Sequence, residues 1–422
     1  MRRLHLIPLF LFVAAVPVAA QIGVPAVGRT VGSVLEPVTG AIGRLDLPDV
    51  TAPVRSIAGL ARDRISRLRD VLRQNRATME PDERGDPARR GVVLMLDADD
   101  TALAAVRALG FGVRPAESFG NLGLSATELD VPDGMELAGA LDLLRRTVPE
   151  KTFTADQLHF PSGGAAEDPA ATGKGSSGKA RGAGAIGTPV GMIDGGVGPS
   201  ITVLAARGFA KGGPRGSDHG TAVASLLRHA GVRSIVAADV YGDDPAGGSA
   251  LAIVRALDWM QGQNVPVVTI SLAGPANPLL ARAVAACSAR GMTVVAAVGN
   301  DGPAAPPVYP ASYRQVLAVT GVDGRNRALI EAGRAAHLDY AAPGADMKAM
   351  DARGRWRAVR GTSFAAPLVA ARAAAAWDRA RDGGRGGGDV RAALDREARD
   401  LGRKGADDSF GRGLLCGDCR PR

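Results

Sequence analysis

Three residues between positions 194 and 363 have the types needed for covalent catalysis by a serine. Asp194 ends the run VGMID, His219 opens HGTAVAS and Ser363 opens SFAAPLVAA. A serine hydroxyl becomes a good nucleophile when a neighbouring base takes its proton, and a carboxylate can hold an imidazole in the orientation that this needs. A fourth polar residue, Asn300, ends the run VVAAVGN. The sequence therefore offers a nucleophile, a base and an orienting group, if the fold brings them together.

Each of these residues also has an ordinary structural explanation. Asp194 precedes two glycines and could be a turn residue, and His219 could simply start a helix. Asn300, in the sequence NDG, could adopt a left-handed turn conformation. Ser363 could cap a helix, because a hydroxyl accepts hydrogen bonds from first-turn amides. These alternatives weaken when the residues are taken together, since they supply complementary parts of one mechanism.

Strands and helices alternate from residue 186 onward. The strand-like runs are GTPVGMID, SIVAADVYG, VPVVTISLA and MTVVAAVGN, and the helical runs between them are HGTAVASLLRHAG, SALAIVRALDWMQGQ and NPLLARAVAACSARG. Asn277 as a cap, Pro278 in the first turn and Gly291 after the last turn bound the last of these helices. Strands that are apolar on both faces are typical of a parallel sheet covered by helices. In such α/β sheets, active sites form beyond the carboxyl ends of the strands, where the four polar residues fall.

The segments around these residues resemble those of a known family, the subtilisin-like serine peptidases (subtilases, peptidase family S8). VGMIDGGV resembles the segment around the family's aspartate, DHGTAVAS that around its histidine, VVAAVGNDG that around its oxyanion asparagine and GTSFAAPLVAA that around its serine. The chain order Asp, His, Ser is that of subtilisin, and GTSFAAP lacks the G-x-S-x-G elbow of α/β-hydrolases. The similarity continues to the closing run FGRGLL, so it covers residues 186 to 415.

The resemblance implies a serine endopeptidase with an acyl-enzyme intermediate on Ser363. His219 would be the base, Asp194 would orient it, and the Ser363 amide together with the Asn300 side chain would stabilise the oxyanion. The resemblance also implies that the substrate backbone adds as a strand to Ser271, Leu272, Ala273 and Gly274, and that the primary pocket is walled by Ala296, Ala297, Val298 and Gly299. Because these residues are small and uncharged, we expect an apolar side chain before the cut.

Two other functions remain as alternatives. The first is a catalytically inactive subtilase fold that serves as a binding scaffold, and the second is an esterase that uses the same site. Gly195, Phe364 and Leu368 depart from the family pattern, in which Ser or Thr, Met and His are common, but none of these changes removes a catalytic group. The loops between the motifs are short, so the family's calcium sites cannot be carried over, and we expect no metal and no cofactor.

Residues 1–20, MRRLHLIPLFLFVAAVPVAA, have the pattern of a secretory signal peptide. A basic start at Arg2 and Arg3 precedes a short apolar core and a small-residue exit that ends in Ala20. Pro8, Pro17 and the shortness of the run argue against a spanning helix, and arginines interrupt the later apolar runs. We therefore expect a secreted protein, periplasmic or extracellular, with no stable membrane span; an uncleaved anchor is the alternative.

The rest of the N-terminal half divides by composition. Residues 21–90 form a linker with an arginine-rich helix, RDRISRLRDVLRQNR, which we expect to be solvated or weakly docked. Residues 91–160 alternate strand and helix patterns as a small α+β domain. Their element order resembles the family's prodomain, which implies an inhibitor of the chain's own active site; a permanent accessory domain is the alternative. Residues 161–187 are rich in Gly, Ala and Ser, typical of an exposed linker, and precede a peptidase domain at 188–415 and a tail at 416–422.

Composition restricts the partners of the protein. The net charge is +8, yet the basic residues are spread along the chain and aromatic residues make up only 4%. A nucleic-acid-binding face needs clustered charge, so we expect a polypeptide substrate and no nucleic acid. Three cysteines cannot form a disulfide framework. Cys416 and Cys419 are expected as a local disulfide or two free thiols, and Cys287 as a small core residue.

Overall fold

The computed structural model describes residues 57–162, 164–165, 184–382 and 389–421. The expected signal peptide at 1–20, the following residues up to 56 and most of the expected linker at 161–187 lie outside the described residues. Two of the regions inferred from the sequence, the small α+β region and the larger α/β region, are therefore described almost in full.

The larger region is built on a seven-stranded parallel sheet, as the alternating pattern predicts. Every neighbouring pair of strands is parallel. In spatial order the strands are β10 (Ala205–Gly208), β11 (Ile235–Asp239), β9 (Val190–Asp194), β12 (Val267–Ile270), β14 (Thr293–Ala297), β15 (Leu317–Val322) and β16 (Tyr340–Pro343). The central strands are buried on both faces because helices cover both sides of the sheet.

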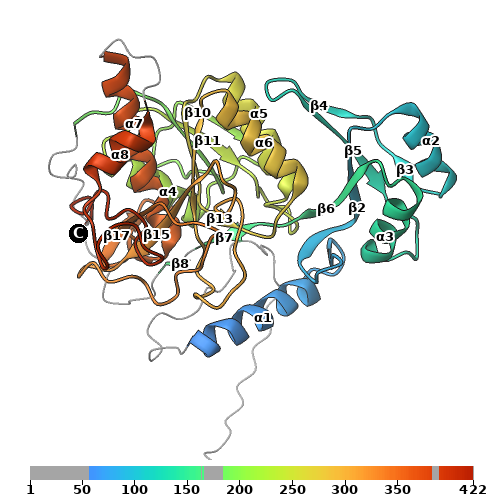
Figure 1. The fold of residues 1–422 in the computed structure, drawn as a ribbon, viewed down its shortest axis with the longest axis horizontal. Helices are drawn as coiled ribbons and strands as arrows, with labels where there is room; N and C mark the ends of the chain where they lie inside the picture. The colour runs from blue at the N-terminus through green and yellow to red at the C-terminus, as the bar shows by residue number, and fades with distance from the viewer. Residues whose placement is uncertain (1–56, 163, 166–183, 383–388, 422) are drawn as a thin grey trace, which may run out of the picture. The chain divides into compact units, whose positions relative to one another are not determined.

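The helices form one layer on each face of this sheet (Figure 1). Ile193 packs with α5 (Ala250–Gly262) and α6 (Pro278–Ala289), whereas its neighbour Met192 packs with the opposite layer. The opposite layer consists of α4 (Asp218–His229), α7 (Ala366–Asp382) and α8 (Val390–Glu397). The predicted start of α6 is confirmed, since the Asn277 side chain accepts a hydrogen bond from the Leu280 amide at 3.0 Å.

The N-terminal region is a six-stranded antiparallel sheet with two helices. Its elements are β1 (Met79–Pro81), β2 (Pro87–Leu96), α2 (Asp100–Ala108), β3 (Gly112–Val113), β4 (Glu117–Phe119), β5 (Leu124–Asp130), α3 (Leu137–Thr147) and β6 (Thr152–Gln157). The α+β order matches the expectation, although the sheet begins at Met79, before the expected start at residue 91. Figure 1 shows α2 and α3 on the face of this sheet that points away from α5 and α6. The other face, with Leu94 and Leu96 of β2, packs into the core that contains α5 and α6.

A helix, a β-hairpin and a 3₁₀ turn complete the surroundings of the site. The helix, α1 (Ile57–Gln74), precedes β1, and the hairpin of β17 (Met347–Met350) and β18 (Trp356–Arg360) leads into the 3₁₀ turn, η1 (Thr362–Phe364).

Cys416 and Cys419 form a disulfide, and Cys287 is buried with a free thiol. Among the described residues, no helix is long and apolar enough to cross a membrane.

Candidate active site

Asp194 and His219 form a hydrogen-bonded pair at the carboxyl end of the sheet. Asp194 is the last residue of β9, and its two carboxylate oxygens lie 2.9 and 3.0 Å from Nδ1 of His219. The Gly195 amide donates to the same carboxylate at 2.7 Å. His219 is the second residue of α4, whose first turn is capped by Ser217. The carboxylate, 1% exposed, therefore fixes the orientation of the imidazole.

The glycine at position 195, where the family commonly has Ser or Thr, has a local explanation. A Cβ atom added to Gly195 would clash with Oγ of Ser217. That hydroxyl already accepts the Gly220 amide at 3.0 Å as the cap of α4. A larger side chain at 195 would displace the cap that holds the start of the helix carrying His219.

Ser363 lies in η1, directly before α7, and its hydroxyl does not act as a helix cap. The Ser363 Oγ donates to the Ser271 carbonyl at 2.9 Å, and the Ser271 Oγ donates to the Ser363 carbonyl at 2.9 Å. The rings of His219 and Phe364 are 5.4 Å apart, which places the histidine beside this turn. Within the described residues, His219 Nε2 is buried and has no hydrogen-bond partner. The structure thus places the Asp194–His219 pair beside the turn that carries Ser363, whose hydroxyl is directed at Ser271.

Asn300 and Ser363 both donate to one carbonyl oxygen of the chain itself. The Ser363 amide lies 3.1 Å from the Ser162 carbonyl oxygen, and the Asn300 Nδ2 donates to the same atom. The orientation of the Asn300 amide is set by its other end, since Oδ1 accepts the Thr362 amide at 3.0 Å. A peptide carbonyl held by two donors is the geometry of an oxyanion hole with an occupant. No pattern in the sequence indicates that Ser162 would occupy this position.

The residues before Ser162 cross the site as an extended strand. In the antiparallel pair of β7 (Phe160–Pro161) and β13 (Leu272–Ala273), Leu272 lies opposite Pro161 and Ala273 opposite Phe160. The Ser162 amide donates to the Ser271 carbonyl at 3.2 Å. On the strand's other edge, the backbone amide of His159 donates to the Gly248 carbonyl at 2.8 Å. The strand is therefore paired on both sides.

Beyond Ser162 the chain pairs with the other side of the site. In the antiparallel pair of β8 (Gly164–Ala165) and β18, Ala165 lies opposite Val359 and Gly164 opposite Arg360. The short strand β8 therefore attaches the chain after Ser162 to β18.

The other residues predicted to contact the substrate have mixed positions. Gly274 exchanges backbone hydrogen bonds with Tyr309 at 2.9 and 2.8 Å instead of pairing with β7. Ala296 and Ala297 are fully buried, on opposite faces of the sheet, and Val298 is also a core residue. Gly299, with φ +82°, is the member of that segment that faces Ala273 beside the strand.

Among the described residues, no group of three or more His, Cys, Asp or Glu side chains is placed to hold a metal ion. The groups that the site offers are a hydroxyl, an imidazole, a carboxylate and two N–H donors aimed at one carbonyl. This set of groups is sufficient for acyl transfer from a peptide carbonyl to a serine.

The fold and the site define a serine protease of the α/β type, and comparison with known proteins gives its family. A family profile described as "Subtilase family" matches residues 187–413. Subtilisin Savinase from Lederbergia lenta is 32% identical over 209 residues, which cover 46% of this chain and 77% of that protein. Alkaline protease from Shouchella clausii is also 32% identical over 209 residues, but these cover 55% of its length. The chain belongs to the subtilase family of serine proteases.

Structural comparison agrees on the fold. The crystal structure of fervidolysin from Fervidobacterium pennivorans, described as a keratinolytic enzyme related to subtilisin, superimposes with a TM-score of 0.63. The match covers 79% of this chain and 61% of that one, at 17% sequence identity. At this identity the similarity shows the shared architecture alone.

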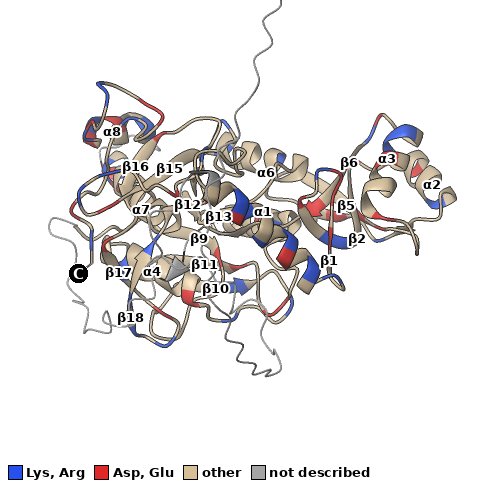
Figure 2. Ribbon diagram, turned by 90° about the horizontal axis from the view of Figure 1, so that it is seen from below, with Lys and Arg blue, Asp and Glu red and all other residues tan. Residues whose placement is uncertain are grey.

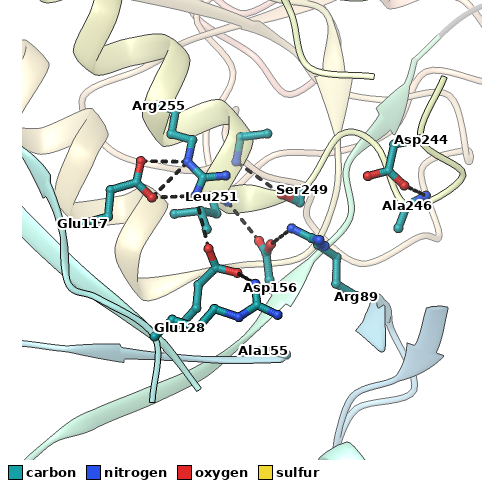
Figure 3. A network of polar contacts seen from close by, with 12 residues as sticks. Arg89, Glu117, Glu128, Ala155, Asp156, Asp244, Ala246, Ser249, Leu251 and Arg255 are labelled. Atoms are coloured by element: carbon teal, nitrogen blue, oxygen red, sulfur yellow. Dashed lines mark hydrogen bonds and ion pairs between the residues drawn. The ribbon is translucent and has the colours of Figure 1, made fainter. Parts of the chain in front are cut away.

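The antiparallel sheet contacts the site's scaffold through charged groups at α5 (Figure 3). Arg255 of α5 binds Glu117 of β4 at 2.5 to 3.0 Å and Glu128 of β5 at 3.1 Å. Asp156 of β6 is fully buried and accepts the Leu251 amide, in the first turn of α5, at 2.9 Å. These contacts hold β6, and therefore the strand that follows it, against the larger region.

Two buried groups beside the site titrate in opposite senses. Burial raises the pKa of Asp156 from 3.8 to about 6, although the Leu251 amide and Arg89 oppose the shift. Burial lowers the pKa of His159 from 6.5 to about 4. Asp156 therefore contributes stability at low pH that is lost as pH rises through 6, whereas His159 contributes stability at neutral pH that is lost as pH falls through 4. Between pH 4 and pH 6 the unfolding free energy from Asp156 falls with rising pH while that from His159 rises, so the two pH dependences largely cancel.

We expect single substitutions to reveal this cancellation. Relative to a parent chain with Ser363→Ala, Asp156→Asn should gain about 2 kcal/mol in unfolding free energy as pH rises from 4 to 6.5, because it removes the cost of burying a carboxylate. His159→Gln should gain a similar amount as pH falls over the same range. Urea unfolding at several pH values measures both differences. Slopes of the same sign in the two variants would contradict the assignment.

Proposed function

We propose that this protein is a serine endopeptidase whose first substrate is the peptide bond after its own residue Ser162. The observation that carries the proposal is the Ser162 carbonyl oxygen, which accepts hydrogen bonds from the Ser363 amide and from Asn300 Nδ2. The strand before it is paired on both edges, as an extended substrate would be. The membership of the subtilase family supports the same chemistry.

The mechanism follows from the positions of the groups. Ser363 Oγ leaves the Ser271 carbonyl by rotation to another staggered rotamer and attacks the Ser162 carbonyl carbon, while its proton passes to Nε2 of His219. Asp194 keeps the proton on Nδ1 and stabilises the imidazolium. The negative charge that develops on the Ser162 oxygen is stabilised by the two donors that already contact it.

Collapse of this intermediate breaks the bond to residue 163. His219 then gives its proton to the leaving amine, and Ser162 remains as an ester on Ser363. A water molecule, deprotonated by His219, attacks the ester and restores the free serine. The products are an N-terminal fragment that ends at Ser162 and a peptidase domain that begins at Gly163.

The same site would then act on other polypeptides. The residue before the first cut would be Ser162, which is small but polar, whereas the sequence suggested an apolar residue there; its size suits a position beside Gly299. We propose that the signal-like residues 1–20 direct secretion of the protein. We also propose that residues 91–160 block the site until the fragment that ends at Ser162 leaves. Mass spectrometry of the protein purified from culture medium tests all three points. A mature N-terminus at Gly163 is the expected result, whereas an intact chain from Gln21 that is fully active would overturn the self-cleavage.

One observation favours the inactive scaffold as a second candidate. The Ser363 hydroxyl bonds to Ser271 and not to His219. A fluorophosphonate probe separates the two functions, because it reacts with a serine that a base activates. We expect labelling of Ser363 in the cleaved protein, while an unlabelled cleaved protein would favour the scaffold.

We expect Asn300→Ala to lower turnover on a peptide substrate by about 10²- to 10³-fold, a magnitude taken from subtilisin. The substitution removes one donor to the oxyanion but leaves the Ser363 amide and the Asp194–His219 pair in place. KM should change little, because the interaction is stronger in the transition state than in the substrate complex. Steady-state kinetics measure the separation, and a loss confined to KM would argue against the role.

A further inference from the structure

α1 contacts the loop that carries the oxyanion asparagine. Arg64 Nε lies 3.2 Å from a carboxylate oxygen of Asp301, the residue after Asn300, and Arg67 forms an ion pair with the other oxygen. Leu60 is 7% exposed and lies against Gly302, where an added Cβ would approach it to 3.0 Å. Figure 2 shows the basic positions along this helix. The helix expected to be solvated or weakly docked is therefore attached at the edge of the site.

The C-terminal end of α1 contacts the strand that occupies the site. Val71 and Leu72 belong to one apolar cluster with Phe160 of β7, two residues before Ser162. Leu158, two residues before β7, is in this cluster as well. One helix thus contacts both the loop that stabilises the oxyanion and the segment that would be cut.

α1 is also fastened to the antiparallel sheet. Asn75 Nδ2 donates to the Val71 carbonyl at 2.9 Å, and the Met79 amide of β1 donates to the Asn75 carbonyl at 2.9 Å. Arg64 lies 3.8 Å from Asp86, just before β2. Cleavage after Ser162 would leave α1, the sheet and β7 in one fragment.

We propose that α1 is a clamp that keeps this fragment on the peptidase domain after cleavage and so delays the onset of activity toward other substrates. The proposal rests on the proposed function and adds the regulation of its site. The fragment must leave before a new peptide can enter. Its departure requires the Arg64 and Arg67 contacts with Asp301 to break, and these side chains are only 24%, 30% and 21% exposed. Partly desolvated charge pairs at an interface act mainly on the rate of dissociation.

The test follows cleavage and activity separately in the full-length chain refolded from urea. Mass spectrometry gives the rate of appearance of the fragment that ends at Ser162, and hydrolysis of a fluorogenic peptide gives the lag before activity. The clamp variant is Arg64→Ala with Arg67→Ala. The matched control is Arg69→Ala with Arg73→Ala, which removes the same charge from two exposed positions of the same helix.

We expect the clamp variant to be cleaved as fast as the wild type, within about twofold, and to shorten the lag by about tenfold. The control should keep the wild-type lag. Raising the salt concentration should shorten the lag of the wild type and of the control, because salt screens the ion pairs with Asp301. The clamp variant lacks these ion pairs, so its lag should not change. A purely structural role of α1 would not produce this difference in salt response.

Two results would overturn the clamp: equal lags in the clamp variant and the control, or no lag in the wild type after cleavage. A clamp variant that is cleaved more slowly by tenfold or more would instead assign α1 to the folding of the fragment, and would also overturn it. Failure of the proposed function is a distinct outcome, because the wild type would then show neither cleavage after Ser162 nor peptide hydrolysis.

Discussion

Replacing Ser363 by alanine is expected to abolish peptide hydrolysis and to leave the chain uncut after Ser162. The loss should be on the order of 10⁶ in turnover, a magnitude taken from the nucleophile of subtilisin. The alanine removes the only atom that forms a bond to the Ser162 carbonyl carbon in the proposed mechanism. The Ser363 amide stays, so the Ser162 carbonyl should keep its hydrogen bonds and the fold should be unchanged.

Two readouts check this prediction on one preparation. Electrophoresis and mass spectrometry show whether the full-length chain accumulates, and a fluorogenic peptide gives the residual rate. Ser288→Ala in α6 is a suitable control, since it makes the same chemical change away from the site. A purified Ser363→Ala chain that is cut after Ser162 at the wild-type rate, with no other protease present, would contradict the assignment of the nucleophile.

Asp194→Asn should reduce turnover by about 10⁴-fold while the site keeps its shape. The carboxylate accepts the proton of His219 Nδ1 at 2.9 and 3.0 Å, and this contact leaves Nε2 free to receive the proton of Ser363. An asparagine amide in the same place donates to Nδ1 and so favours the tautomer with the proton on Nε2. The base is then protonated at the position where it must accept.

The control for this prediction is Asp218→Asn. It makes the same change next to His219, at the start of α4, where the carboxylate accepts the Ala352 amide at 2.9 Å. Kinetics on one peptide should show a change of at most a few-fold for Asp218→Asn. Equal losses in the two variants would indicate a general effect of charge near the helix start and would contradict the specific role of Asp194.

The positions of the catalytic candidates were predictable because the signals for them are local. The apolar runs before Asp194 and Asn300 predict strands, and parallel strands place their carboxyl ends at one edge of a sheet. The start of α6 was predictable for the same reason, since Asn277 caps a turn only three residues long. In these cases neighbouring residues determine the conformation.

The contents of the site were not predictable, because they depend on contacts between distant residues. β7 has two residues, too few to show a periodic pattern, and Ser162 meets Asn300 across 138 positions of sequence. The amphipathic pattern of α1 was visible, but its partner Asp301 lies 234 positions from Arg67. The choice of glycine at 195 likewise depends on Ser217 of another segment.

The unequal attachment of the chain on the two sides of Ser162 gives the proposed cleavage a direction. On one side the strand continues into a sheet, a helix and the contacts at α5, while on the other side β8 pairs with β18 over two residues. Re-forming the bond would require the new amine to stay where it was released. Because the short strand is the weaker of the two attachments, the amine departs first, and the ester on Ser363 then reacts with water. The fold would thus make the processing step a one-way reaction.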